Sequence, residues 1–265
     1  GTIVLGQDAT VSATGKTRAQ AESLGVNVSF GAAAGGSVAK ADAVSRVNAY
    51  LGNNTQLTGR NLTVSATQAL AGTGRVCRHV GTALVKVSND TRQQADGSGF
   101  AAGIVAAGFN DARATSNTVT EAALGDNVYI AAPAAGPATL MTAVSVIADG
   151  TDRNRANATS GSGGVISGAA ATATTSSTSR TTATTGSGDD ARRIAAKTFT
   201  LKATHLTDYN AVVNGVNASV VGASGARAVN AVDSTVRAEI GAGGRVSAND
   251  IVVLAGNSST KHWIG

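Results

Sequence analysis

The sequence has little of what stabilises most compact domains. It contains one cysteine, Cys77, so an internal disulfide is excluded, and no spacing of cysteine and histidine resembles a zinc site. Aromatic residues make up 3% of the 265 residues and charged residues 14%, against about 25% charged residues in ordinary globular domains. With two prolines and weak charge, the chain also differs from collagen-like, mucin-like and highly charged disordered chains.

Long hydrophobic runs are missing too. The longest, such as FAAGIVAAGF at 100–109, are too short and too rich in glycine for a transmembrane helix, and no signal peptide opens the chain. Because Gly1 begins in the middle of a pattern, we expect an excerpt of a longer repetitive chain. The net charge is +5, but the basic residues are scattered and stacking aromatics are scarce, so we expect no nucleic-acid binding.

Small hydrophobic residues in alternation are what the chain has instead. Hydrophobic residues make up 42% of it and glycine contributes 33 residues, which suits a fold whose internal walls lie close together. A period of two is typical of a strand with one face on a core. Five segments with this period predict the inward residues Ala9, Val11 and Ala13; Leu62, Val64 and Ala66; Val128, Ile130 and Ala132; Phe199, Leu201 and Ala203; and Ile251, Val253 and Ala255.

Glycine after a large aliphatic residue is a second landmark, and it predicts corners at Gly6, Gly52, Gly125 and Gly241, where a positive φ favours glycine. Gly6 and Gly52 lie 46 residues apart, and Gly241 and Gly265 lie 24 apart, close to multiples of 23–24. Such a period is typical of solenoids. We therefore predict an all-β fold: one right-handed parallel β-helix over residues 1–265, with 23–24 residues per coil and roughly eleven coils.

Longer units also repeat. Residues 25–52, 99–125 and 215–241 correspond over nearly their full length, and residues 164–186 form a degenerate fourth copy poorer in large apolar residues. We expect the lowest local stability in that fourth copy. By propensity, residues 30–51 also suit a helix. Their internal glycines and the spacing of serine and asparagine favour strands.

The segments VNAYLGNNTQLTGRNLTVSATQ, VRAEIGAGGRVSANDIVVLAGN and DATVSAT resemble the repetitive shafts of very large secreted bacterial adhesins, the filamentous-haemagglutinin-like and leukotoxin-type filamentous adhesin families. The resemblance spans nearly the whole chain, but it concerns a style of repeat and contains no catalytic signature. It implies an extracellular or cell-surface β-helical rod that presents binding regions. The sequence shows neither the secretion motifs expected near the start of such proteins nor a membrane anchor, as we expect for one segment of a long shaft.

Strand edges exposed at the two ends of such a rod could stack copies end to end into a filament. Host or environmental surface glycans are a second potential partner. We predict no cofactor, no metal and no catalytic residue.

Two alternatives remain open. One is a β-helical polysaccharide-active enzyme, for which acids aligned on neighbouring coils would be Asp149, Asp152, Asp189, Asp190 and Asp208. Most of these lie in turn-like contexts, where aspartate is favoured for local hydrogen bonds. Cys77 with His79, and His205 with Asp208 and Tyr209, are further groupings, which we interpret as a buried cysteine beside a chance histidine and as a solvated loop. His262 completes the histidines.

The other alternative is an ice- or glycan-binding solenoid. Thr172, Thr174 and Thr178 lie in the stretch ATATTSSTSRTTATT and could face outward as a flat surface of hydroxyl and methyl groups. No matching ladder of threonines is visible in the rest of the sequence. We therefore interpret the stretch as an exposed polar rung or loop, with surface contact as the alternative.

Overall fold

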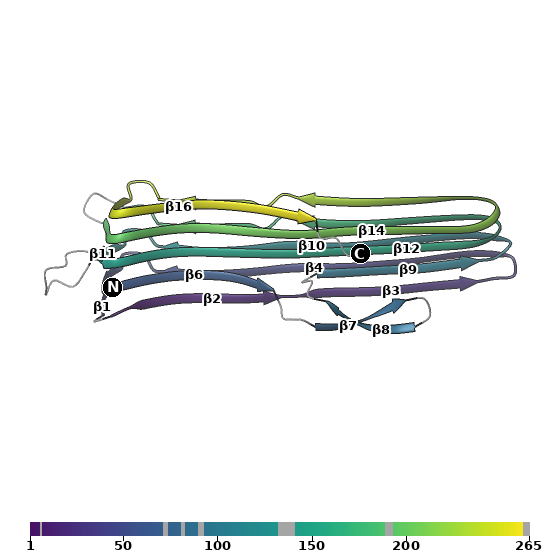
Figure 1. Ribbon diagram of the computed structural model, residues 1–265, viewed down its shortest axis with the longest axis horizontal. Coiled ribbons are helices and arrows are strands. Elements are labelled where there is room, and N and C mark those ends of the chain that lie inside the picture. The colour runs from purple at the N-terminus through teal and green to yellow at the C-terminus, as the bar shows by residue number, and fades with distance from the viewer. Residues whose placement is uncertain are drawn as a thin grey trace.

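The computed structural model describes residues 1–5, 7–70, 74–80, 83–89, 93–131, 141–188 and 193–261. Within these ranges every regular element is a strand, and fourteen strands form one parallel sheet that does not close on itself. The predicted all-β class with a parallel solenoid-type sheet is confirmed. The strands run along the long axis of the molecule and stack across it (Figure 1).

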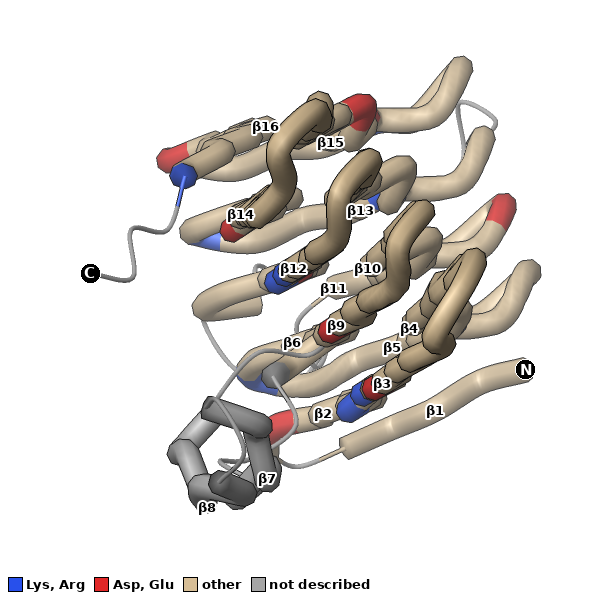
Figure 2. The backbone as a smooth tube through the Cα atoms, turned by 90° about the vertical axis from the view of Figure 1, so that its right-hand side faces the viewer, with Lys and Arg blue, Asp and Glu red and all other residues tan. Residues whose placement is uncertain are grey.

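Each coil runs out along one face of the molecule and returns along the other. In the first coil β1 (Thr2–Val4), β2 (Ala9–Thr17) and β3 (Ala19–Val28) run out and β4 (Ala32–Leu51) returns. In the second, β5 (Gln56–Thr58), β6 (Asn61–Leu70) and β9 (Gln93–Ala102) run out and β10 (Val105–Leu124) returns. Seen along the strands, the coils lie one above another (Figure 2).

The later coils follow the same path with longer strands. In the third coil β11 (Tyr129–Ala131) and the first part of β12 (Met141–Ser177) run out, and the rest of β12 returns with β13 (Arg180–Thr184). In the fourth, β14 (Arg193–Val232) runs out and turns back, followed by β15 (Thr235–Glu239), and β16 (Arg245–Lys261) starts a fifth level. β7 (Gly74–Val80) and β8 (Ala83–Asn89) form an antiparallel hairpin inserted between β6 and β9.

The coils are two to three times longer than predicted. Leu51 lies beside Leu124, 73 positions further along the chain, and Val105 lies beside Ile166, 61 positions further. The predicted period of 23–24 residues and the eleven coils are therefore wrong, since the described residues form four coils and part of a fifth. One coil contains two long faces, and the 20 residues of β10 alone span roughly 65 Å.

The long repeated units are the return strands. Residues 32–51 align one to one with 105–124, and Val119–Ala123 align with Arg180–Thr184, which align in turn with Thr235–Glu239. The helical alternative for residues 30–51 is excluded, because β4 is a continuous strand. The lower stability expected for residues 164–186 stays a prediction.

The predicted corner glycines stack on one another for a different reason from the one expected. A Cβ on Gly125 would lie 2.8 Å from the carbonyl carbon of Gly52, and a Cβ on Gly241 would lie 2.6 Å from that of Gly186. A Cβ on Gly186 would likewise lie 2.3 Å from the carbonyl carbon of Gly125. Close approach of the backbones therefore requires glycine at positions 125, 186 and 241, whereas a Cβ on Gly52 would meet only Thr55 Oγ1 at 3.9 Å. Gly6 lies outside the described residues.

The positive φ angles at these corners belong to later residues. Asn54 has a φ of 53°, Asn127 of 54° and Gly243 of 70°, each two positions after a stacked glycine. Asparagine tolerates this left-handed region better than most residues. Asn127 Nδ2 donates to Asn54 Oδ1 at 3.3 Å, so side-chain amides also connect the corners of successive coils.

The inward columns largely follow the predicted alternation. Leu62 aligns with Ala9 on one side and Val144 on the other, and Val144 aligns with Phe199. Val144, Val146 and Ala148 are thus members of the column that the sequence reasoning missed. The predicted residues Leu62, Val64, Val128, Ile130, Phe199 and Leu201 are buried, and Val11 packs against them.

Part of the predicted core is wrong, and the rest is divided between two columns. Ile251 and Val253 align with Phe199 and Leu201, but they are 50% and 47% exposed. They lie on β16, which no return strand covers within the described residues. Ile130 is buried in a separate column, beside Leu57 and Ile194, rather than in the column of Leu62.

Two large apolar cores fill most of the space between the faces, and a third, small cluster consists of Ala33, Ala101 and Ala106. The aliphatic core lies near the stacked glycines and contains Phe199, Leu62, Leu124, Val64 and Met141 among others. The alanine core lies further along the strands and consists of Ala39, Ala41, Ala95, Ala112, Ala114, Ala156, Ala158, Ala171, Ala173 and Ala211. The described residues contain no helix that could cross a membrane.

Candidate functional site

A buried polar cluster separates the two cores. Along β12 the inward residues change from Val146 and Ala148 to Asp152 and then to Ala156, and along β14 His205 occupies the corresponding interval. His205 Nε2 lies 3.3 Å from Asp152 Oδ2, and His205 Nδ1 lies 2.9 Å from the Thr181 hydroxyl. The cluster therefore joins β12, β13 and β14 through the interior.

Hydroxyl groups from the return face complete the environment of Asp152. The Thr118 hydroxyl donates to Asp152 Oδ1 at 3.1 Å, and the Ser177 hydroxyl donates to Oδ2 at 2.7 Å. Ser179 accepts from the backbone N–H of Thr118 at 2.9 Å. Burial raises the pKa of the Asp152 carboxyl, but His205, Ser179 and Ser177 outweigh it and lower this pKa to about 2.

Asp152, His205 and Thr181 form a chain of carboxylate, imidazole and hydroxyl, which is the order of groups in a nucleophilic triad. The Asp152 and His205 side chains are each 0% exposed and Thr181 is 0% exposed. A substrate therefore has no path to the hydroxyl in this conformation. The arrangement suits a structural role, because a buried carboxylate is tolerated when it is paired and hydrogen-bonded.

Gly150 makes room for this cluster. A Cβ at this position would lie 2.3 Å from Thr181 Oγ1 and 2.4 Å from His205 Nδ1. Any other residue would displace the imidazole or the hydroxyl.

Asp208 and Asp149, two of the candidate acids, each have a partner of their own. Asp208 is bound by Arg153, with 2.8 Å between the guanidinium nitrogen and Oδ2, and Asp149 accepts from the Thr204 hydroxyl. Asp149 aligns with Thr204, four residues before Asp208 on the neighbouring strand. This places the two backbones roughly 14 Å apart.

Several predicted residues fall outside this cluster. Tyr209 is half-buried on β14, and His205, Asp208 and Tyr209 belong to this strand instead of a solvated loop. Cys77 and His79 lie on β7, opposite Lys86 and Leu84 of β8, but their side chains lie outside the described part of the structure. Asp189, Asp190 and His262 also lie outside the described residues.

The threonine stretch forms the end of β12, the turn after it and β13. Thr172 and Thr174 are half-buried and Thr178 is exposed. Thr172 aligns with Asp111 and Arg227, and Thr174 aligns with Arg113 and Val229. Charged residues and valine thus flank these threonines where a hydroxyl array would need more threonine. Surface contact by the three threonines stays a prediction.

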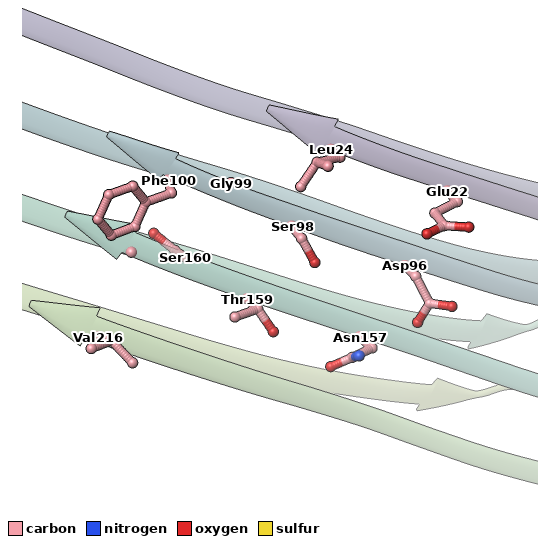
Figure 3. A pocket seen from close by; sticks show the side chains of 11 residues that line it. Glu22, Leu24, Asp96, Ser98, Gly99, Phe100, Asn157, Thr159, Ser160 and Val216 are labelled. Atoms are coloured by element: carbon pink, nitrogen blue, oxygen red, sulfur yellow. The ribbon is translucent and has the colours of Figure 1, made fainter. Parts of the chain in front are cut away.

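A hollow on the outer face is a feature that the sequence reasoning missed. The outer-face hollow has a volume of about 380 Å³ and is lined by Glu22, Leu24, Asp96, Phe100, Asn157 and Val216 together with small polar residues. Figure 3 shows the three polar side chains Glu22, Asp96 and Asn157 at one end and Phe100 and Val216 at the other. Recognising it from sequence requires the true coil length, because its residues come from four separate coils.

The described residues hold no group of three or more histidine, cysteine, aspartate or glutamate side chains that could bind a metal ion. Comparison of the chain with known protein families, with curated proteins and with solved structures gives no match.

Proposed function

We propose that the chain is a structural, non-catalytic segment of a secreted or cell-surface adhesin-like protein, in which stacked coils form a stiff rod. The observation that carries the proposal is the unbroken, in-register pairing of long strands from coil to coil. All 20 residues of β4, from Ala32 to Leu51, align with successive residues of β10. Such a ladder gives each coil little stability alone and much with its neighbours, as in other solenoids.

The polar interior supports the same proposal. Asp152, His205 and the surrounding hydroxyls connect three coils across both faces, so shear between coils would break buried hydrogen bonds as well as backbone pairs. This favours resistance to force over the flexibility that a catalytic site requires.

End-to-end association is the corresponding proposal for partners. Within the described residues, β16 pairs only with β14 and β2 pairs only with β6, so each has one unpaired edge. Open parallel edges are templates for further strands, either of the same chain or of a second copy. Negative-stain microscopy over a range of concentrations tests this: filaments support it, and dispersed single particles at the highest concentration contradict it.

Labelling of cells tests the proposed location. Antibodies raised against the folded chain should bind intact cells of the organism that produces it, and brief protease treatment of those cells should remove the signal. Labelling that requires permeabilised cells would overturn the proposed surface role.

Single-molecule force spectroscopy tests the mechanical role. We expect the chain to extend in steps that each correspond to the unfolding of one coil.

A further inference from the structure

The outer-face hollow combines an aromatic surface with acceptor oxygens on adjacent strands. Glu22, Asp96 and Asn157 align on β3, β9 and β12, and Val26, Phe100 and Gly161 align four residues further along the same strands. Side chains two residues apart on a strand face the same way. Polar and apolar groups therefore lie side by side on one surface (Figure 3).

The Phe100 ring packs against the backbone of β12 at Gly161. A Cβ on Gly161 would lie 2.6 Å from Phe100 Cδ2 and 3.2 Å from Cε2, so the ring covers the glycine. The ring is nevertheless 44% exposed. One side of it is fixed against the sheet, and the rest is available to a ligand. Leu24 and Val216, exposed by 57% and 62%, extend this apolar surface.

The polar end of the hollow has acceptors without donors. Asp96 Oδ2 accepts from Gln94 Nε2, but the buried Asp96 Oδ1 and Asn157 Oδ1 have no hydrogen-bond partner. Asp96 is 9% exposed and Asn157 is 6% exposed, so their unpaired oxygens are unfavourable in the free protein. The outermost torsion of aspartate and asparagine is soft, so a turn of either group aims its oxygen into the hollow.

These two ends together define the ligand. The acceptors need a partner rich in hydrogen-bond donors, and the ring needs an apolar face of similar size. Among the described residues no lysine or arginine lines the hollow, whereas Glu22 and Asp96 bring negative charge, which disfavours an acidic ligand. A metal ion would use the oxygens and leave the ring unused, and a hydrocarbon would leave the oxygens unpaired.

We propose that the outer-face hollow binds an uncharged pyranose sugar. The C–H face of the sugar packs on the Phe100 ring, and its hydroxyl groups donate to Asp96, Asn157 and Glu22. The volume of about 380 Å³ is within the range of small-ligand sites. This inference does not depend on the proposed structural role. The chain could form a rod without binding a sugar, and it could bind a sugar without forming part of a rod.

The test is saturation-transfer NMR on the whole chain with glucose, galactose, mannose, N-acetylglucosamine and glucuronate. We expect a saturable signal for at least one uncharged sugar, with a dissociation constant on the order of millimolar, as is usual for a ligand of this size with few contacts. Glucuronate should bind at least tenfold more weakly. No saturable binding of any uncharged sugar at about 100 mM, or preferential binding of glucuronate, would overturn the proposal.

Matched variants locate the binding. Phe100→Ala should weaken it at least tenfold, whereas Phe109→Ala on the return strand β10, where Phe109 is 49% exposed, should leave it unchanged. Asp96→Asn replaces an acceptor by a donor and should also weaken it about tenfold. Circular dichroism of each variant confirms that the fold is kept. Equal binding by Phe100→Ala and wild type would refute the site.

Substitutions at two glycines distinguish a displaced Phe100 ring from a general loss of structure. Gly161→Ala should displace the ring and weaken binding, although it removes no ligand contact. Gly163→Ala, on the same side of β12, should have no effect, since a Cβ there would lie at an ordinary 3.8 Å from Phe100 Cζ. Equal effects of the two substitutions would contradict the proposed role of the ring.

Discussion

The aliphatic core and the alanine core have the same strand pairing but are filled by side chains of very different size. In the first, Phe199, Leu201 and Leu62 fill the space between the faces, and in the second, methyl groups such as those of Ala112, Ala158 and Ala173 do so. The faces must therefore approach more closely along the alanine core. Side-chain volume thus sets the thickness of the coil while register stays unchanged.

The polar cluster lies where the two cores meet. Asp152 and His205 follow Ala148 and Ala203 on their strands and precede the alanine core. Hydroxyl, carboxylate and imidazole groups fill the change in thickness and fix the lateral position of the faces through directional bonds. Packing alone is non-directional, so we infer that the cluster supplies alignment and the cores supply most of the stabilisation.

The largest effect is expected in the aliphatic core. Phe199→Ala should lower the free energy of unfolding by about 3–5 kcal/mol, because it leaves a cavity between fully buried neighbours. Ile251→Ala, at the aligned but half-exposed position of β16, should cost far less. Urea titration followed by circular dichroism measures both, and similar losses would contradict the role assigned to burial.

The alanine core should be destabilised by larger side chains rather than by smaller ones. Ala173→Leu is expected to destabilise by about 3 kcal/mol, since the closely spaced faces cannot accept a larger side chain. Ala228→Leu is the control, because Ala228 aligns with Ala173 but is exposed. If Ala173→Leu were neutral in the same urea titration, the faces would not be closely packed there.

Acid should weaken the junction between the cores. The pKa of Asp152 lies near 2 in the folded chain and near 3.8 when unperturbed, so the charged carboxylate stabilises the fold above about pH 4. This contribution, about 2 kcal/mol, is lost as the pH falls from about 4 to about 2. Unfolding free energies measured across this range should show a smaller pH dependence for Asp152→Asn than for wild type.

A surface carboxylate provides the comparison for that titration. The pKa of Asp8 is also lowered, mainly by its hydrogen bond with Arg60, but the pair lies in solvent. Asp8→Asn should therefore leave most of the acid sensitivity in place. If Asp8→Asn removed the pH dependence of the unfolding free energy and Asp152→Asn left it in place, Asp8 and not Asp152 would be the source of the acid sensitivity.

The smallest effect is expected outside both cores. Arg46 and Glu121 form an ion pair of 3.3 Å between β4 and β10, with side chains 66% and 34% exposed. A double-mutant cycle with alanine should give a coupling below about 1 kcal/mol, which decreases with added salt. A coupling as large as the effect of Phe199→Ala would mean that outer-face charges rival the cores.

Alternation of polar and apolar residues is what made the fold predictable from sequence. The inward placement of Leu62, Val64, Phe199 and Leu201 needs only the two-residue period of a strand, which is a local property. The coil length is a long-range property. The landmark of glycine after a large aliphatic residue predicts the wrong coil length, because it omits the corner at Gly186, which follows threonine. Without it, Gly125 and Gly241 are two coils apart.

The sites were less predictable because they depend on register. Asp152 and His205 were both noticed as chemical groups, but their contact follows only when Gly150 is known to align with His205. The hollow similarly requires the offset of 74 positions between Glu22 and Asp96. That offset includes the hairpin of β7 and β8, whose length no periodicity of the coil encodes.

The hairpin itself has a practical consequence. Thr67 aligns with Asp149, and Gln93 aligns with Asn154. The third coil therefore advances five residues between these points, whereas the second coil advances twenty-six. The chain leaves the sheet and rejoins it in register, and the stack above and below continues. This point on the surface is thus a natural place for foreign sequence: an epitope, a tag or a whole guest domain grafted there would be carried by the scaffold without entering its interior.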